Sequence, residues 1–277
     1  MTRSFLVVAC VFVLSLAASA QSDIRNVDFK NFTYNAVCIG ESPEDVTVKN
    51  GEFSFEKQED GYVDRFYFKI LGIEYGDVTG DQQPEAVILS VCNTGGTGNF
   101  TEGYIFSITS GKPTLIARIP GGDRAYGGLR TAKVVRGILI VESNDVGELG
   151  GACCPEFIVT TRFRVSNGKL MRTGVVSRRD IIPTERVSFA RGKSGITFKT
   201  RISAGEQRRF IVGAKAGQTL SVSVSSDDAK LRLLDEARVT EGINNFRALL
   251  SSTRDYRIQI DNTSSRDLEI VMNVKID

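Results

Sequence analysis

Short segments in which apolar and polar side chains alternate recur along this chain of 277 residues. Residues 66–70, 220–224 and 268–276 each place an apolar side chain at every second position. Successive side chains of a β-strand point to opposite faces, so this period predicts strands with one buried face. Residues 85–92 are apolar at nearly every position, which is typical of a central strand covered on both sides. Long helical periodicity is absent, and we therefore expect a mainly β protein.

Turn signals separate these segments. Asn50–Gly51, Arg136–Gly137 and Asn167–Gly168 lie between predicted strands, as does the Ser-Gly-Lys-Pro run at 110–113. A type I′ hairpin turn needs a positive φ at both central residues, and Asn-Gly adopts this conformation readily. The Asn-Gly pairs therefore predict type I′ hairpins.

The first 20 residues have the pattern of a cleavable signal peptide. Arg3 supplies a positive charge, residues 5–16 are apolar, and Ala18-Ser19-Ala20 is a small-x-small cleavage signal. The apolar run is too short to span a bilayer comfortably. We expect an exported protein, periplasmic or extracellular, which begins at Gln21 and does not span the membrane after cleavage.

Charge divides the remaining chain. Acidic residues outnumber basic ones in residues 21–175, whereas basic residues outnumber acidic ones from 176 onward. This asymmetry favours two units. We expect two domains: a disulfide-tied, β-rich domain at 21–175 and a jelly-roll-like β-sandwich at 198–277. Residues 176–197 are polar and weakly patterned, and are expected to form the linker, with room for a short strand or helix.

Four cysteines follow the predicted signal peptide, namely Cys38, Cys92, Cys153 and Cys154. Export exposes them to an oxidising compartment, so disulfides are expected. Four cysteines allow three pairings. A bond between adjacent residues is strained, because ordinary disulfides hold their Cα atoms about 5.5 Å apart. We therefore favour bonds from Cys38 and Cys92 to one member each of the Cys153–Cys154 pair. That pair lacks C-x-x-C spacing and a histidine partner, so a structural role is favoured over metal or redox chemistry.

Three long connections are rich in glycine, at residues 93–98, 121–128 and 147–152. Glycine permits close backbone approach and unusual φ values, which binding loops use. The alternative is that these segments only connect neighbouring strands, and the sequence leaves both interpretations open.

A calcium loop is predicted at Asp77, Thr79, Asp81, Gln83 and Glu85. These residues place oxygen ligands at alternate positions, with the main-chain carbonyl of Gln83 as one of them, and Ca²⁺ binds several such oxygens. The alternative is a tight acidic turn without metal.

The same segment resembles the Asp-x-Thr-Gly-Asp loops of FG-GAP and integrin-type repeats, which carry calcium between two strands. It departs from their usual glycine after the second aspartate, where Gln82 stands. The likeness covers about nine residues, occurs once, and does not imply a whole propeller. It is not an EF-hand, because position 6 is not glycine.

No catalytic motif stands out. The chain has no histidine, which excludes Ser-His-Asp and Cys-His arrangements and imidazole-bound zinc. Carboxylate pairs could still act as acid and base. The carboxylates near the glycine-rich segments are expected to be solvated: Asp123, Glu142, Asp145, Glu148 and Glu156.

A group of basic residues after position 176 could attract an anionic polymer, although a solvated surface is the simpler interpretation. The group comprises Arg178, Arg179, Arg186, Arg191, Lys193, Lys199, Arg201, Arg208 and Arg209. Acidic residues are interspersed among them, so nucleic acid is not expected as a partner.

The last 80 residues resemble the bacterial pre-peptidase C-terminal domain family. The likeness is carried by residues 214–224, 231–235 and 255–260. The family implies a small jelly-roll-like β-sandwich appended to secreted proteins, and the periplasmic inhibitors of g-type lysozyme are similar to the same kind of domain. Such a fold specifies no activity.

These observations predict an exported, non-catalytic binding or accessory protein whose partner is an envelope or extracellular protein or polymer. One alternative, which follows from the resemblance, is a periplasmic inhibitor of a lysozyme-type enzyme. The other is a carboxylate-based hydrolase.

Overall fold

A computed structural model describes residues 23–37, 43–148 and 150–277. The predicted signal peptide and Cys38 lie outside the described residues. The described chain is mainly β, as predicted, and its helical structure is the 3₁₀ turn η1 (Ile24–Asn26). None of its helices is long and apolar enough to cross a membrane.

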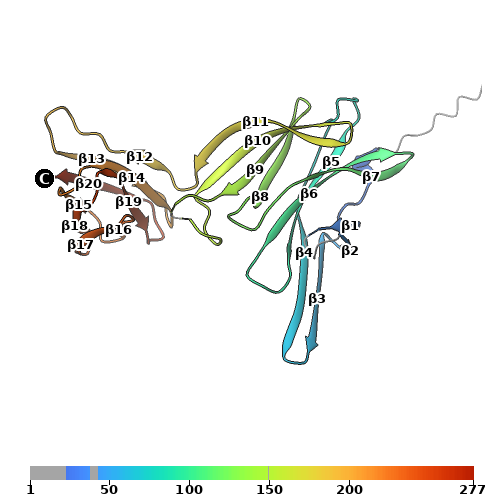
Figure 1. The fold of residues 1–277 in the computed structure, drawn as a ribbon, viewed down its shortest axis with the longest axis horizontal. Coiled ribbons are helices and arrows are strands. Elements are labelled where there is room, and N and C mark those ends of the chain that lie inside the picture. The colour runs from blue at the N-terminus through green and yellow to red at the C-terminus, as the bar shows by residue number, and fades with distance from the viewer. Residues whose placement is uncertain (1–22, 38–42, 149) are drawn as a thin grey trace, which may run out of the picture.

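The first large sheet is antiparallel, with strand order β3-β4-β5-β6-β7. Its strands are β3 (Glu52–Glu59), β4 (Tyr62–Gly76), β5 (Glu85–Asn93), β6 (Phe100–Thr109) and β7 (Lys112–Ile119). The segment predicted as a doubly covered strand is β5, the central strand, and its first six residues are buried. A small sheet pairs β1 (Thr33–Ala36) with β2 (Glu44–Thr47). The long β3–β4 hairpin projects from the body of the molecule (Figure 1).

The second sheet has strand order β11-β10-β9-β8. It contains β8 (Leu129–Val135), β9 (Ile138–Asp145), β10 (Phe157–Ser166) and β11 (Lys169–Asp180). Asn167 and Gly168 join β10 to β11 with φ values of 51° and 68°, and Asn50 and Gly51 have φ values of 53° and 85°. Both central residues of each Asn-Gly turn therefore have the positive φ that a type I′ turn requires.

Two further sheets contain the remaining strands, with orders β12-β14-β19-β16 and β13-β20-β15-β18-β17. The first is made of β12 (Thr184–Arg186), β14 (Gln207–Ala214), β19 (Arg254–Asn262) and β16 (Ala229–Leu233). The second is made of β13 (Gly195–Ile202), β20 (Leu268–Ile276), β15 (Thr219–Val224), β18 (Asn245–Leu250) and β17 (Ala237–Glu241). Residues 176–197, expected as a linker, contain the end of β11, the first three residues of β13 and all of β12, which pairs in parallel with β14.

Three hydrophobic clusters underlie these sheets. One consists of buried residues between 187 and 276, contributed by both later sheets. A second packs η1, β1 and β2 against the first sheet, with Tyr34 and Phe68 fully buried. The third lies between the first and second sheets and includes Leu89 and Leu139. Figure 1 shows β3–β7, β8–β11 and β12–β20 following one another along the long axis.

The disulfides differ from the favoured pairing. Cys153 and Cys154 are bonded to each other, with Cα atoms 3.8 Å apart. Cys92 is also disulfide-bonded. The preference for bonds from Cys38 and Cys92 to the adjacent pair was therefore wrong: the short Cα separation that argued against a vicinal bond is accommodated in the loop before β10.

Candidate interaction surface at the glycine-rich loops

Two of the glycine-rich segments, 93–98 and 121–128, are tied together by hydrogen bonds around Asn99. The Asn99 N–H donates to Asp123 Oδ1 at 2.8 Å, and the Arg124 N–H donates to the Asn99 carbonyl at 3.1 Å. The Asn93 side chain donates back to the Gly98 carbonyl at 2.5 Å. These contacts hold the connection between β5 and β6 against the connection between β7 and β8.

The third segment, 147–152, joins the same group. The Ala125 N–H donates to the Ala152 carbonyl at 3.3 Å. The Asn144 side chain donates to the Arg124 carbonyl at 2.8 Å. Three connections that are far apart in the sequence thus form one surface, which we call the loop surface: residues 93–100, 121–128, 147–148 and 150–152.

Close backbone packing explains the glycines at 121–128. A β-carbon on Gly121 would lie 1.9 Å from the Thr101 carbonyl oxygen, and one on Gly122 would lie 1.8 Å from the Tyr126 carbonyl oxygen. Neither separation is sterically possible. These two glycines therefore serve loop packing, and the side chains available to a partner are their neighbours.

Two aromatic side chains are exposed on the loop surface. Phe100 is 43% exposed and Tyr126 is 55% exposed, while Ala125 beside Tyr126 is buried. The loop at 121–128 therefore buries Ala125 and exposes the ring of Tyr126. Exposed aromatic rings on an ordered backbone are characteristic of protein interfaces.

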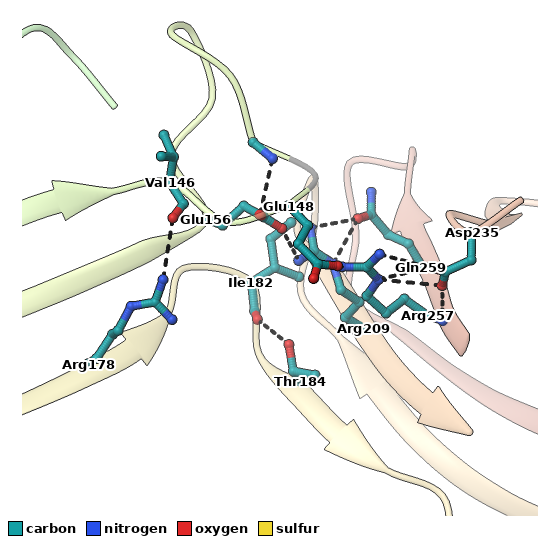
Figure 2. Close-up of polar contacts among 11 residues, drawn as sticks. Val146, Glu148, Glu156, Arg178, Ile182, Thr184, Arg209, Asp235, Arg257 and Gln259 are labelled. Atoms are coloured by element: carbon teal, nitrogen blue, oxygen red, sulfur yellow. Dashed lines mark hydrogen bonds and ion pairs between the residues drawn. The ribbon is translucent and has the colours of Figure 1, made fainter. Parts of the chain in front are cut away.

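The segment 147–156 also reaches the later sheets (Figure 2). Glu156 Oε1 accepts a hydrogen bond from Arg209 Nη1 on β14 at 3.1 Å, and its Oε2 accepts one from the Gly150 N–H at 3.1 Å. Arg209 also donates from Nε and Nη2 to Gln259 Oε1 on β19, each at 3.3 Å. One buried guanidinium therefore connects the loop before β10 to two strands of another sheet.

A second arginine extends this junction. Arg257 Nη1 lies 3.3 Å from Glu148 Oε2, and its Nη2 lies 2.7 Å from Asp235 Oδ1. Burial raises the pKa of Asp235, but hydrogen bonds from the side chain and backbone of Arg257 and from Arg254 outweigh it and hold that pKa below its ordinary value. Asp235 therefore stays ionised and orients Arg257 toward Glu148.

All five carboxylates noted near the glycine-rich segments form ion pairs with arginine. The pairs are Asp123–Arg124, Glu142–Arg179, Asp145–Arg178, Glu148–Arg257 and Glu156–Arg209. Glu156 departs furthest from the expectation of a solvated carboxylate, since its side chain is 7% exposed. Nothing in its local sequence indicated this, because its partner lies 53 positions away.

The basic group after position 176 is not an unpaired cationic patch. Seven of its members pair with carboxylates: Arg178, Arg179, Arg186, Lys199, Arg201, Arg208 and Arg209. Arg209 is buried, in contrast to the solvated position expected for it. These pairs reduce the attraction of this face for an anionic polymer.

The predicted calcium loop connects β4 to β5, and its carboxylates accept hydrogen bonds from its own backbone. Asp77 accepts from the N–H groups of Gly80 and Gln82 at 2.6 and 3.0 Å, and Asp81 accepts from the Gln83 N–H at 2.8 Å.

Glu85, the last predicted ligand, is buried and accepts from the Val78 N–H at 2.8 Å and the Thr79 N–H at 3.3 Å. Thr79 Oγ1 also lies 3.3 Å from Glu85 Oε1. In the described part of the chain, no three His, Cys, Asp or Glu side chains are grouped to hold a metal ion.

Comparison with known proteins gives limited matches. No family model matches the chain, and neither does any curated protein. Among solved structures it is similar to the periplasmic inhibitor of g-type lysozyme from Aeromonas hydrophila, at 23% identity and a TM-score of 0.32, over 35% of this chain and 97% of that one.

Two further structures carry the same description. A mutant of the Escherichia coli inhibitor is 15% identical over 35% of this chain and 99% of its own, with a TM-score of 0.29. The Salmonella Typhimurium inhibitor is 17% identical over 34% and 98%, with a TM-score of 0.30. About two thirds of this chain lies outside each match.

Proposed function

We propose that this chain is an exported, non-catalytic binding protein that contacts a protein or polymer of the cell envelope or extracellular space through its loop surface. The observation that supports this is the pair of exposed rings, Phe100 at the start of β6 and Tyr126 on the β7–β8 connection, where backbone hydrogen bonds link the two connections. Rigid aromatic side chains bury a large area on binding at low entropic cost.

Binding is favoured over hydrolysis by the state of the nearby carboxylates. A glycosidase of the common type needs two carboxyl groups facing one cleft, one of which gives up a proton. Each of the five carboxylates near the loop surface is instead engaged by an arginine. Carboxylates paired in this way are expected to stabilise the structure instead of transferring protons.

The test compares the full mature chain with the double variant Phe100→Ala/Tyr126→Ala. Purified protein is titrated onto isolated peptidoglycan sacculi and onto an immobilised envelope-protein fraction. We expect saturable binding to one of them, weakened about tenfold or more in the double variant because central aromatic side chains often carry most of an interface's energy.

Ile243→Ala is the matched control, since Ile243 is 84% exposed and lies on the connection between β17 and β18. Equal binding by wild type and double variant would overturn the proposed surface. Release of soluble sugar or peptide fragments from the sacculi would overturn the non-catalytic assignment.

Inhibition of a lysozyme-type enzyme is a second candidate, supported by the sequence resemblance of residues 214–224, 231–235 and 255–260. The full chain is titrated against lysozymes of several types while lysis of a bacterial suspension is followed by turbidity. Stoichiometric inhibition of one type supports the candidate, and unchanged lysis at a large excess of this chain rejects it.

A further inference from the structure

Two edge strands lie next to each other in the structure. β7 ends the first sheet and β11 ends the second. They meet at the β10–β11 turn, where a β-carbon on Gly168 would lie 3.8 Å from the Ile116 carbonyl oxygen. Each edge strand has one side that no neighbouring strand of its sheet covers, and such a side is where a further strand can pair.

A groove of about 790 Å³ opens between these strands. Its floor is β10, where Val159, Thr161 and Phe163 alternate on one face. Its walls include Ala117 on β7 and Leu170 on β11. Apolar side chains on the face of β10, beside the uncovered edge of β7, have the geometry of a β-sandwich in which one sheet lacks a strand.

Positive charge lines the groove. Lys169 and Arg172 lie on the β11 wall and Arg118 on the β7 wall. Arg118 is paired with Glu102, whereas neither Lys169 nor Arg172 forms an ion pair with the described residues. Asp145 also lines the groove, but Arg178 neutralises it. The groove therefore favours an occupant with negative charge.

The outer edge of β11 is apolar as well as basic. Met171, Val175 and Val176 are 52%, 51% and 46% exposed. A long, exposed apolar edge attracts a further strand. Antiparallel pairing of two β11 strands, however, would set the Lys169–Arg172 end of one copy beside the Arg178–Arg179 end of the other, where Asp145 and Glu142 balance the arginines and leave no surplus negative charge for Lys169 and Arg172. A second copy of this chain is thus a poor occupant.

We infer that this groove binds an extended, acidic peptide segment of a partner protein by strand addition. Backbone groups of the segment pair with the uncovered edge of β7, its apolar side chains cover Val159 and Phe163, and its carboxylates meet Lys169 and Arg172. A peptide is favoured over an anionic polysaccharide because only a peptide offers the regular N–H and C=O row that matches an edge strand. The groove adjoins the loop surface at Gly127, but the inference goes beyond the proposed function and does not rest on Phe100 or Tyr126.

The test uses fluorescent synthetic peptides with the full mature chain. A peptide of alternating Glu and Val is compared with one of alternating Lys and Val, by fluorescence anisotropy at low and at physiological salt. We expect saturable binding of the Glu–Val peptide alone, weakened by salt. The variant Lys169→Glu/Arg172→Glu, which changes two exposed side chains, should lose about tenfold or more of this affinity and gain binding of the Lys–Val peptide.

The matched control is Arg238→Glu/Arg247→Glu, which reverses two exposed charges on β17 and β18 and should change nothing. Hydrogen exchange should slow at amides of β7 when the Glu–Val peptide binds. Phe100→Ala/Tyr126→Ala should leave the peptide affinity unchanged, which separates this inference from the loop surface.

Three results would overturn the inference. The Glu–Val peptide does not bind saturably, or its affinity is unaffected by the charge reversal, or it binds without protecting any amide of β7. Binding of polygalacturonate through Lys169 and Arg172 in the absence of peptide binding would likewise assign the groove to a polymer.

Discussion

Glu156 and Arg209 form a buried ion pair that joins the loop before β10 to β14. The carboxylate oxygen and the guanidinium nitrogen lie 3.1 Å apart, and the two side chains are 7% and 11% exposed. Arg209 is held further by Gln259, and its N–H donates to the Pro183 carbonyl at 2.8 Å. The remaining donors and acceptors of the pair are therefore satisfied, which a buried charge requires.

Removing one partner of this pair should be costly. In Arg209→Met the carboxylate of Glu156 is left buried without its counter-charge, and we expect a loss of about 3–5 kcal/mol in the free energy of unfolding. Urea denaturation measures it. Arg201→Ala is the control, because its pair with Asp267 is exposed, at 73% and 43%, and should be worth under about 1 kcal/mol.

The double variant Glu156→Gln/Arg209→Met should recover much of that loss. It removes both charges, and replacing a buried pair by neutral groups is often close to neutral in stability. A double variant no more stable than Arg209→Met alone would show that the arginine contributes by packing and by its bonds to Gln259.

Acid should destabilise the protein in part through Asp235. Its pKa is depressed below the ordinary 3.8 by Arg257 and Arg254, so the native state holds the ionised form. The stability that results is present above about pH 3.8 and is lost as the pH falls through the folded-state pKa. In Asp235→Asn this part of the stability loss at low pH should vanish, although the variant is less stable than wild type at neutral pH. Urea midpoints measured from pH 6 downward check this, and parallel curves for the two proteins would contradict it.

Glu85 should show the opposite pH dependence. Burial raises its pKa above the ordinary 4.5, and hydrogen bonds from Val78 and Thr79 oppose this only in part. The native state therefore binds this proton more tightly than the unfolded chain does. The stability that results is present below about pH 4.5 and is lost as the pH rises through the folded-state pKa. Relative to wild type, Glu85→Gln should gain stability as the pH rises above about 4.5.

The matched substitution Glu85→Ala should lose stability at every pH. It leaves the N–H groups of Val78 and Thr79 without their acceptor, which costs about 1–3 kcal/mol for a buried donor. If Glu85→Gln and Glu85→Ala were equally unstable at pH 7, the carboxylate itself, and not hydrogen-bond acceptance, would hold this turn.

Calcium binding at residues 77–85 stays a prediction. Adding Ca²⁺ should raise the melting temperature of wild type, because an ion bound to the native state stabilises it by mass action. Asp81→Ala should abolish the rise, whereas its effect without calcium should be small, since the exposed Asp81 accepts a hydrogen bond from the nearby Gln83 N–H and from no other described residue. Identical melting curves of wild type in calcium and in chelator would reject the site.

The vicinal disulfide has a direct chemical test. Proteolysis under non-reducing conditions should release one peptide that contains Cys153 and Cys154 with both sulfurs oxidised, and Cys92 in a separate cross-linked species. Mass spectrometry identifies both. A peptide that links Cys92 to Cys153 or Cys154 would restore the pairing first favoured from the sequence.

Strands and tight turns could be predicted because their signals are local. The period of two at 268–276 reappears as β20, whose burial alternates along its whole length. The Asn167–Gly168 turn follows from the φ values that this pair tolerates. Residues 241–250 have a less regular apolar pattern, and six of them form β18 (Asn245–Leu250).

The amino-acid sequence by itself thus determined the mainly β class and the hairpin turns, since alternation and turn conformation depend on neighbouring residues. Only the tertiary structure decided that three glycine-rich segments form one surface, that Cys153 bonds to Cys154, and that Glu156 meets Arg209. Each of these depends on which connections the sheets bring together. A carboxylate looks the same in sequence whether water or a guanidinium 53 positions away surrounds it.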